Sequence, residues 1–192
     1  YKLVLELVKD QDVKNKLNQA LSKIPGLMRE VLLLDPLIAE LSAQLVRKNH
    51  CLFLGRGVSY PLAMEGALKL KEISYIHAES YPAGELKHGP LALIDNDMPV
   101  IAIAPNDGLL EKLKSNLQEV SARGGQLIIL TEKNLSLDFM LSASFIKLPQ
   151  VPEFVLPMVY ALPLQMLAYH VACQKGTDVD QPRNLAKSVT VE

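Results

Sequence analysis

Hydrophobic and polar residues follow two periodicities along the chain, and each predicts one kind of secondary structure. Short apolar runs bounded by turn residues predict buried strands, and apolar residues three or four positions apart predict helices. Strands are predicted at residues 51–54, 76–81, 99–104, 126–131 and 144–148. Helices are predicted at residues 13–34, 35–48, 60–75, 108–123 and 152–174.

The alternation of strands and helices predicts the fold class. Strands that are apolar at successive positions are buried on both faces, which is typical of a parallel sheet covered by helices on each side. We therefore expect an α/β protein, a three-layer α/β/α domain with a mostly parallel sheet of about five strands. Such sheets bind ligands at the carboxyl ends of their strands. The expected functional loops follow Leu54, Tyr81, Ala104 and Thr131.

Local signals set the expected ends of the helices. Asp12 can cap the first helix, and Asp35-Pro36 resembles the N-cap and first position of the second. Pro25-Gly26 should kink or split the first helix, because proline removes a hydrogen bond inside it. Gly124-Gly125 should end the helix that precedes residues 126–131.

The bulk composition narrows the class of protein. The chain has 192 residues, is 49% hydrophobic and 21% charged, and carries a net charge of −1. This fits one globular domain, and no basic block indicates nucleic acid or an anionic membrane surface as a partner. Pro157, Pro163 and Gln165 interrupt the most apolar stretch, 154–173, so we expect no membrane span.

The cysteines and the first residues of the chain indicate the cellular compartment. Cys51 and Cys173 lie in apolar runs, and we expect both to be core residues in a reducing compartment rather than a disulfide or metal pair. The chain begins with Tyr1, and its opening residues lack the apolar core and cleavage site of a signal peptide. We therefore expect a cytoplasmic protein, of which this chain is a fragment.

The stretch Lys69–Pro90 is the densest group of polar residues, and we expect it at the carboxyl edge of the sheet. Within and just before it, Glu65, Lys69 and Glu72 fall in one stripe of a helix that turns about 100° per residue. Such a stripe is either an ion-pair ladder or a site. In a site, the carboxylate would move a proton between adjacent sugar carbons while the lysine stabilises charge on oxygen.

The four histidines differ in their sequence context. His88 lies in a loop before Gly89-Pro90, where it is either a surface residue or a proton shuttle that titrates near neutral pH. His50 and His170 are expected to be structural, and His77 is undecided. No set of histidines, cysteines and acids has the spacing of metal ligands, and no cofactor is expected.

Two further segments carry open alternatives. Gly55–Ser59 joins a strand to a helix and is either a turn with a helix cap or an anion site, although it lacks a full dinucleotide fingerprint. The C-terminal residues 177–192 either fray or pack across a site. If the tail packs across a site, its lysine could form a Schiff base with a ketose, because a lysine amine in a desolvated pocket can react in this way.

Four stretches together resemble the isomerase half of the glucosamine-6-phosphate synthases, also called glutamine–fructose-6-phosphate aminotransferases. They are residues 70–79, 84–94, 122–126 and 181–192. Members of that family have a glutaminase domain followed by two sugar-isomerase (SIS) domains. The resemblance implies three parts: a helical lead-in from the preceding SIS domain (1–34), a second SIS domain (35–175), and a tail that closes the active site (176–192).

The resemblance also implies a reaction. Fructose 6-phosphate would be opened, aminated with ammonia from the glutaminase domain, and isomerised to glucosamine 6-phosphate. By position, Lys187 would form the Schiff base, Glu72 would transfer the proton with Lys69 beside it, and His88 would assist ring opening. Arg183 and Ala186 would bind substrate.

The resemblance further implies a homodimer in which the loop of His88 serves the site of the neighbouring subunit. The phosphate-binding loop and the glutaminase cysteine of the family are missing from this chain, so we expect it to be inactive alone. Two other interpretations stay open. One is a non-enzymatic SIS module that binds a phosphosugar, and the other is a related SIS deglycase that acts on a sugar–amine adduct.

Overall fold

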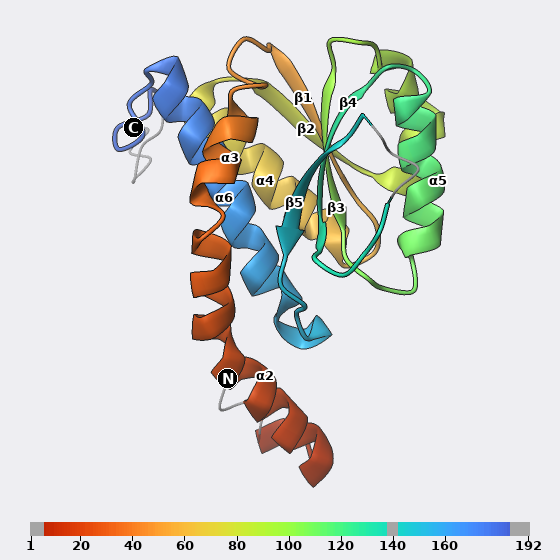
Figure 1. The fold of residues 1–192 in the computed structure, drawn as a ribbon, viewed down its shortest axis with the longest axis vertical. Coiled ribbons are helices and arrows are strands. Elements are labelled where there is room, and N and C mark those ends of the chain that lie inside the picture. The colour runs from red at the N-terminus through yellow and green to blue at the C-terminus, as the bar shows by residue number, and fades with distance from the viewer. Residues whose placement is uncertain (1–5, 138–141, 185–192) are drawn as a thin grey trace, which may run out of the picture.

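A five-stranded parallel sheet forms the middle layer of the domain (Figure 1). The computed structural model describes residues 6–137 and 142–184. The strands lie in the order β2-β1-β3-β4-β5, and every neighbouring pair is parallel. Their bounds are β1 (His50–Gly55), β2 (His77–Pro82), β3 (Pro99–Ala104), β4 (Gln126–Glu132) and β5 (Ser144–Leu148).

Helices cover both faces of this sheet, which confirms the predicted α/β/α fold (Figure 1). On one face α4 packs against β1 and β2, and α6 packs against α4, α3 and α2. On the other face α5 packs against β3 and β4. The helices are α2 (Gln11–Leu32), α3 (Asp35–Ser42), α4 (Ser59–Ser74), α5 (Leu110–Ser121) and α6 (Leu156–Lys175). The described residues also form the short 3-10 helices η1 (Ala83–His88), η2 (Pro90–Leu93) and η3 (Glu153–Val155).

Two hydrophobic cores, one on each face, explain why the strands are apolar at successive positions. On β1, Phe53 packs in the core beneath α4 and α6, whereas Leu52 and Leu54 pack in the core beneath α5. Side chains alternate between the two faces of a strand, so a strand buried on both faces needs apolar residues throughout. Burying one such side chain fully contributes about 1.5–3 kcal/mol.

Three predicted helix ends were wrong. Asp10, not Asp12, caps α2, because its Oδ1 accepts the backbone N–H groups of Asp12 (2.8 Å) and Val13 (3.1 Å). Leu34 takes the N-cap position of α3, so Asp35 is its first helical residue. The same helix ends at Ser42 rather than near residue 48, and turns follow it.

The proline within α2 does not split the helix. α2 runs unbroken through Pro25 and bends along its length (Figure 1). A proline inside a helix removes one hydrogen bond and clashes with the preceding turn. Here Leu27 and Val31, which follow the proline, are buried in the core with α6, and this packing holds the last turns in place.

The helix α6 is apolar over a longer stretch than the sequence analysis predicts. Among the described helices, one segment, Glu153–Lys175, is apolar and long enough to cross a membrane by length and composition, with a mean hydropathy of 1.4. The interruptions at Pro163 and Gln165 therefore do not lower its hydropathy as far as expected. Of its most apolar window, 56% is buried inside the domain. Such burial is typical of a core helix.

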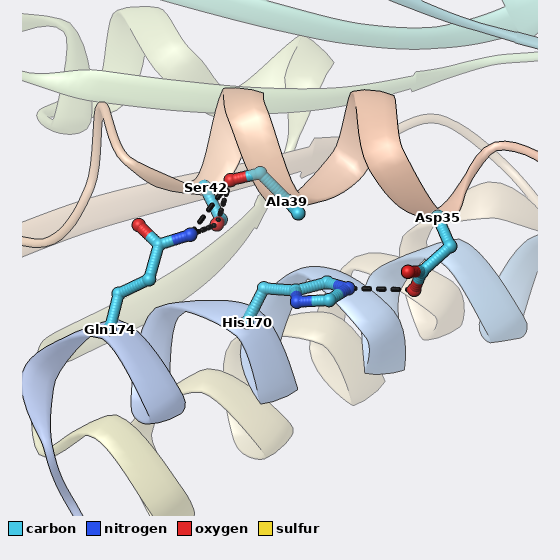
Figure 2. A network of polar contacts seen from close by, with 5 residues as sticks. All are labelled: Asp35, Ala39, Ser42, His170 and Gln174. Carbon is cyan, nitrogen blue, oxygen red and sulfur yellow. Dashed lines mark hydrogen bonds and ion pairs between the residues drawn. The ribbon is translucent and has the colours of Figure 1, made fainter.

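Polar contacts tie α6 to α3 (Figure 2). His170 Nε2 lies 2.7 Å from Asp35 Oδ1 in the first turn of α3. One turn further along α6, Gln174 Nε2 donates to the Ala39 carbonyl and to Ser42 Oγ, each at 2.8 Å. Ser42 is fully buried, and its hydroxyl donates to the Ala39 carbonyl at 2.7 Å. These contacts agree with the expected structural role of His170.

Candidate functional site

Lys69 and Glu72 form an ion pair on the last turns of α4. Lys69 Nζ lies 2.8 Å from Glu72 Oε2, and the two side chains are 35% and 27% exposed. The hydrogen bond to Glu72 raises the pKa of Lys69 above its ordinary value; partial burial opposes this rise, and the charges of Glu72 and Glu65 add to it. Lys69 is therefore held in its charged form beside Glu72, and both side chains are partly exposed to solvent.

The stripe predicted on this helix is only partly an ion-pair ladder. Glu65 Oε1 accepts a long hydrogen bond from Gln165 Nε2 of α6, at 3.5 Å, while Lys69 turns to Glu72. A cation held against a half-buried carboxylate is the arrangement that proton transfer next to a developing oxyanion requires.

The edge at which Glu72 lies differs from the expectation. The helix α4 joins the carboxyl end of β1 to the amino end of β2, and these strands are parallel neighbours. The helix must therefore run back along the sheet, so its last turn lies at the amino edge. Only the last part of the stretch, residues 83–90, follows β2 and so begins at the carboxyl edge. The placement of Lys69 and Glu72 at the carboxyl edge was thus wrong.

His88 is on the other face of the sheet. It ends η1, whose Ala83 and Leu86 are buried in the core beneath α5. Its Nδ1 lies 2.6 Å from Glu85 Oε2, and the imidazole side chain is 74% exposed. Since Glu72 belongs to the α4 face, the structure does not bring His88 and Glu72 together within one chain.

The beginning of the tail returns to the end of α4. After α6 ends at Gly176, Thr177 Oγ1 lies 2.7 Å from the carbonyl oxygen of Ile73 and 3.0 Å from that of Ala172. Further on, the backbone N–H of Arg183 donates to Tyr75 Oη at 3.0 Å. Arg183 therefore lies next to the end of the helix that carries Lys69 and Glu72. Ala186 and Lys187 lie outside the described residues, so their predicted roles stay predictions.

Tyr75 and Thr177 were missed from the sequence. A signal for Tyr75 was present, since it occupies the end of a helix where glycine is common. Thr177 lies just past the glycine that ends α6, and nothing local to it indicates a bond to residue 73. Both act through partners about a hundred positions away, which periodicity cannot reveal.

Side chains of the domain itself pack around the turn Gly55–Ser59. Gly57 has φ +56°, and a Cβ there would lie 2.6 Å from Leu109 Cδ1, so the position requires glycine. Arg56 Nη1 donates to Asn116 Oδ1 of α5 at 3.0 Å. Val58 takes the N-cap position, and no side chain caps α4, so the predicted helix cap is absent. The turn reading is favoured over the anion site.

The remaining candidate groups do not form a metal or disulfide site in the described parts of the chain. No group of three or more His, Cys, Asp or Glu side chains there is placed to hold a metal ion. Both cysteines are free. Cys51 is buried, and burial raises the pKa of its thiol far above the ordinary value. Cys173 is exposed, contrary to expectation, because it lies on the outer side of α6.

His77 lies in a polar row on the edge strand β2. Its Nε2 is 3.2 Å from Glu79 Oε1, and Tyr81 Oη donates to Glu79 Oε2 at 2.8 Å. The hydrogen bond from Tyr81, followed by that from His77, lowers the pKa of Glu79 below its ordinary value despite partial burial. His50 packs edge-on against His77, with 5.6 Å between ring centroids. These contacts are local to the edge of the sheet and leave His77 without an assigned role.

Comparison with known proteins decides the family. The SIS domain profile matches residues 44–175. The chain belongs to the SIS domain family. Among solved structures, this SIS domain is similar to the C-terminal domain of glucosamine-fructose-6-phosphate aminotransferase from Francisella tularensis, with a TM-score of 0.84 and 51% identity over 91% of this chain and 49% of that one. A putative tagatose-6-phosphate ketose/aldose isomerase from Clostridium novyi, 23% identical, shares the fold with a TM-score of 0.74 over 86% of this chain and 44% of that one.

The sequence relatives of this SIS domain are longer proteins. It is 60% identical to glutamine–fructose-6-phosphate aminotransferase [isomerizing] of Legionella pneumophila (strain Paris), over 99% of this chain and 31% of that protein. It is 59% identical to the protein of the same name in Brucella abortus, over 98% of this chain and 30% of that protein. The chain thus spans about a third of the length of these relatives. The predicted resemblance is confirmed.

Proposed function

We propose that this SIS domain is part of an enzyme that makes glucosamine 6-phosphate from fructose 6-phosphate and glutamine-derived ammonia. The names of its relatives and the Lys69–Glu72 pair support this proposal. The relatives are about three times longer, and the proposal assigns the phosphate site and the ammonia source to sequence outside this chain. The proposal includes a cytoplasmic homodimer that needs no cofactor.

The observation that carries the proposal is the cation-paired carboxylate at the end of α4. In the proposed reaction, the Lys187 amine condenses with C2 of the open-chain ketose and releases water, and ammonia then replaces the lysine at C2. Glu72 takes a proton from C1 and returns it to C2, while the proton of the C1 hydroxyl passes to the nitrogen on C2, so the ketimine becomes the 2-amino aldose. Lys69, held charged 2.8 Å from Glu72, stabilises the negative charge that develops on the sugar oxygen.

The position of His88 supports a site shared between subunits. His88 and Glu72 lie on opposite faces of the sheet, and both are accessible. A second subunit that lays its η1 loop against the end of α4 would supply the imidazole for ring opening. In this arrangement each site takes Glu72 and Lys187 from one subunit and His88 from the other.

Product analysis of the full-length protein tests the proposal. Incubation with fructose 6-phosphate and glutamine should give glucosamine 6-phosphate, and fructose 6-phosphate with ammonium salts should give the same product more slowly. Binding of the sugar without any product would support a non-enzymatic SIS module. Release of an amine from a sugar–amine adduct, without amination of fructose 6-phosphate, would support a deglycase.

A further inference from the structure

Tyr75 ends the helix that carries Lys69 and Glu72, and it does so in an unfavourable backbone conformation. Its φ and ψ are 61° and 14°, in the left-handed region, and its backbone N–H bonds to the Lys71 carbonyl. Residues with a Cβ rarely adopt this conformation, and glycine is the usual choice at the end of a helix. The same position in α6 is indeed a glycine, Gly176. A tyrosine at this point therefore indicates a use for its side chain.

Both parts of that side chain contact one residue of the tail. Tyr75 Oη accepts the backbone N–H of Arg183 at 3.0 Å, and the guanidinium carbon of Arg183 lies 4.2 Å from the centre of the tyrosine ring. The first contact fixes the main chain of Arg183, and the second, a cation–π contact, fixes the direction of its side chain. One tyrosine thus holds a residue 108 positions away in both place and orientation.

The rest of the described tail is tied down on the same side. Thr177 Oγ1 bonds near the end of α4, 2.7 Å from the Ile73 carbonyl oxygen. Asp178 Oδ1 accepts the backbone N–H groups of Asp180 and Gln181, each at 2.9 Å, which makes a compact turn between Thr177 and Arg183. The path of the tail is therefore set at both ends of this turn, and Tyr75 provides the last contact before residue 185.

We propose that Tyr75 is a positioning residue that sets where the C-terminal tail leaves the domain, and so brings Lys187 to the Glu72 end of α4. This inference rests on the proposed function. Glu72 precedes Tyr75 by three residues, a rise of about 4.5 Å along the helix. Lys187 follows Arg183 by four residues, which reach at most about 14 Å. A lysine four residues beyond this anchor is therefore within chain reach of the Glu72 end of α4.

The test uses the full-length enzyme and three variants. Tyr75→Gly removes the ring but suits the left-handed backbone, so the fold is retained. Tyr75→Phe keeps the ring and removes only the hydroxyl acceptor. Tyr169→Phe is the matched control, because Tyr169 is an exposed tyrosine of α6. Each is assayed for turnover, for KM of fructose 6-phosphate, for melting temperature, and for the rate at which borohydride traps the sugar on Lys187.

Tyr75→Gly should lower both turnover and the trapping rate on Lys187 by about tenfold to 100-fold, since misplacing a reacting group by 1 Å can cost 100-fold. Its KM should rise only a few-fold, because Tyr75 holds Arg183, a predicted substrate-binding residue, while the phosphate site is proposed to lie outside this chain. Its melting temperature should stay within about 3 °C of wild type. Tyr75→Phe should lie between wild type and Tyr75→Gly, and Tyr169→Phe should match wild type.

Two results would overturn the proposal in distinguishable ways. If wild type is trapped on Lys187 and Tyr75→Gly is trapped equally fast, the positioning role is wrong and the proposed function stands. A fall in activity that simply follows a fall in melting temperature would also reduce Tyr75 to a structural cap. If wild type gives no adduct on Lys187, the proposed function and the positioning role fail together.

Discussion

Replacing Glu72 by glutamine tests whether this carboxylate is catalytic or only pairs with Lys69. Glu72→Gln keeps the size of the side chain and its ability to accept a hydrogen bond from Lys69, but removes its capacity to take a proton. The pair is about one-third exposed, and such i, i+3 pairs on helices contribute about 0.2–0.5 kcal/mol. The free energy of unfolding should therefore change by no more than about 0.5 kcal/mol.

The effect on the reaction should be far larger. A general base contributes about 10²–10⁴-fold to the rate, which is about 3–5 kcal/mol of transition-state stabilisation. We expect Glu72→Gln in the full-length enzyme to lose at least about 100-fold in turnover while binding of fructose 6-phosphate changes by only a few-fold. Turnover is measured by product formation, and binding by calorimetry with the sugar phosphate.

The domain offers a matched control on its opposite face. Glu111 pairs with Lys114 on α5 with the same spacing, at 2.7 Å between Lys114 Nζ and Glu111 Oε1. Glu111→Gln should change stability by a similarly small amount and leave turnover unaltered. If Glu72→Gln retains turnover within tenfold of wild type, or if the two variants behave alike, Glu72 belongs to an ion-pair ladder and the proton-transfer role is refuted.

Other contacts in the domain lead to further testable predictions. Mixing His88→Ala chains with Lys187→Ala chains should restore about a quarter of wild-type activity, since half of the random dimers would hold one intact shared site; no recovery after verified subunit exchange would argue against sharing. Gln174→Ala should lower the free energy of unfolding by about 1 kcal/mol in urea melts, because it removes two hydrogen bonds to α3. Gln165→Ala, whose single contact is long and exposed, should change it by less than about 0.5 kcal/mol, and equal losses would contradict the reasoning. Folding raises the pKa of Lys69, so its stabilising effect is present below the ordinary pKa of 10.5 and lost as the pH rises through the folded-state pKa. Comparing urea melts of wild type and Lys69→Gln at pH 9 and above pH 11 should show the difference shrinking, and a constant or growing difference would refute the pairing.

The layers of the fold could be predicted because β1, β3 and β4 are apolar at successive positions and buried on both faces. Leu52, Phe53 and Leu54 pack into two different cores, so an apolar run was the correct sign of a doubly covered strand. The helix ends were less predictable. Asp10 and Asp12 are both able to cap α2, and which one does so depends on where the backbone leaves the helix.

The site could be predicted only in part. The helical stripe correctly paired Lys69 with Glu72, because spacing alone brings residues three apart onto one side of a helix. Whether Glu72 lies at the carboxyl or the amino edge of the sheet depends on the direction in which α4 runs back. The pattern of apolar residues does not reveal this direction. The bond between Tyr75 and Arg183 links residues 108 positions apart, and such a contact follows only from the assembled domain.

The proposed function requires that this domain supply both the Schiff-base lysine and its proton-transfer partner to one sugar site. The most direct measurement is reduction of the full-length enzyme with borohydride in the presence of fructose 6-phosphate, followed by mass spectrometry of its peptides. We expect a phosphosugar adduct on Lys187 that is absent from Lys187→Ala and still formed in Glu72→Gln. An adduct on a different lysine, or none under conditions of full turnover, would contradict it.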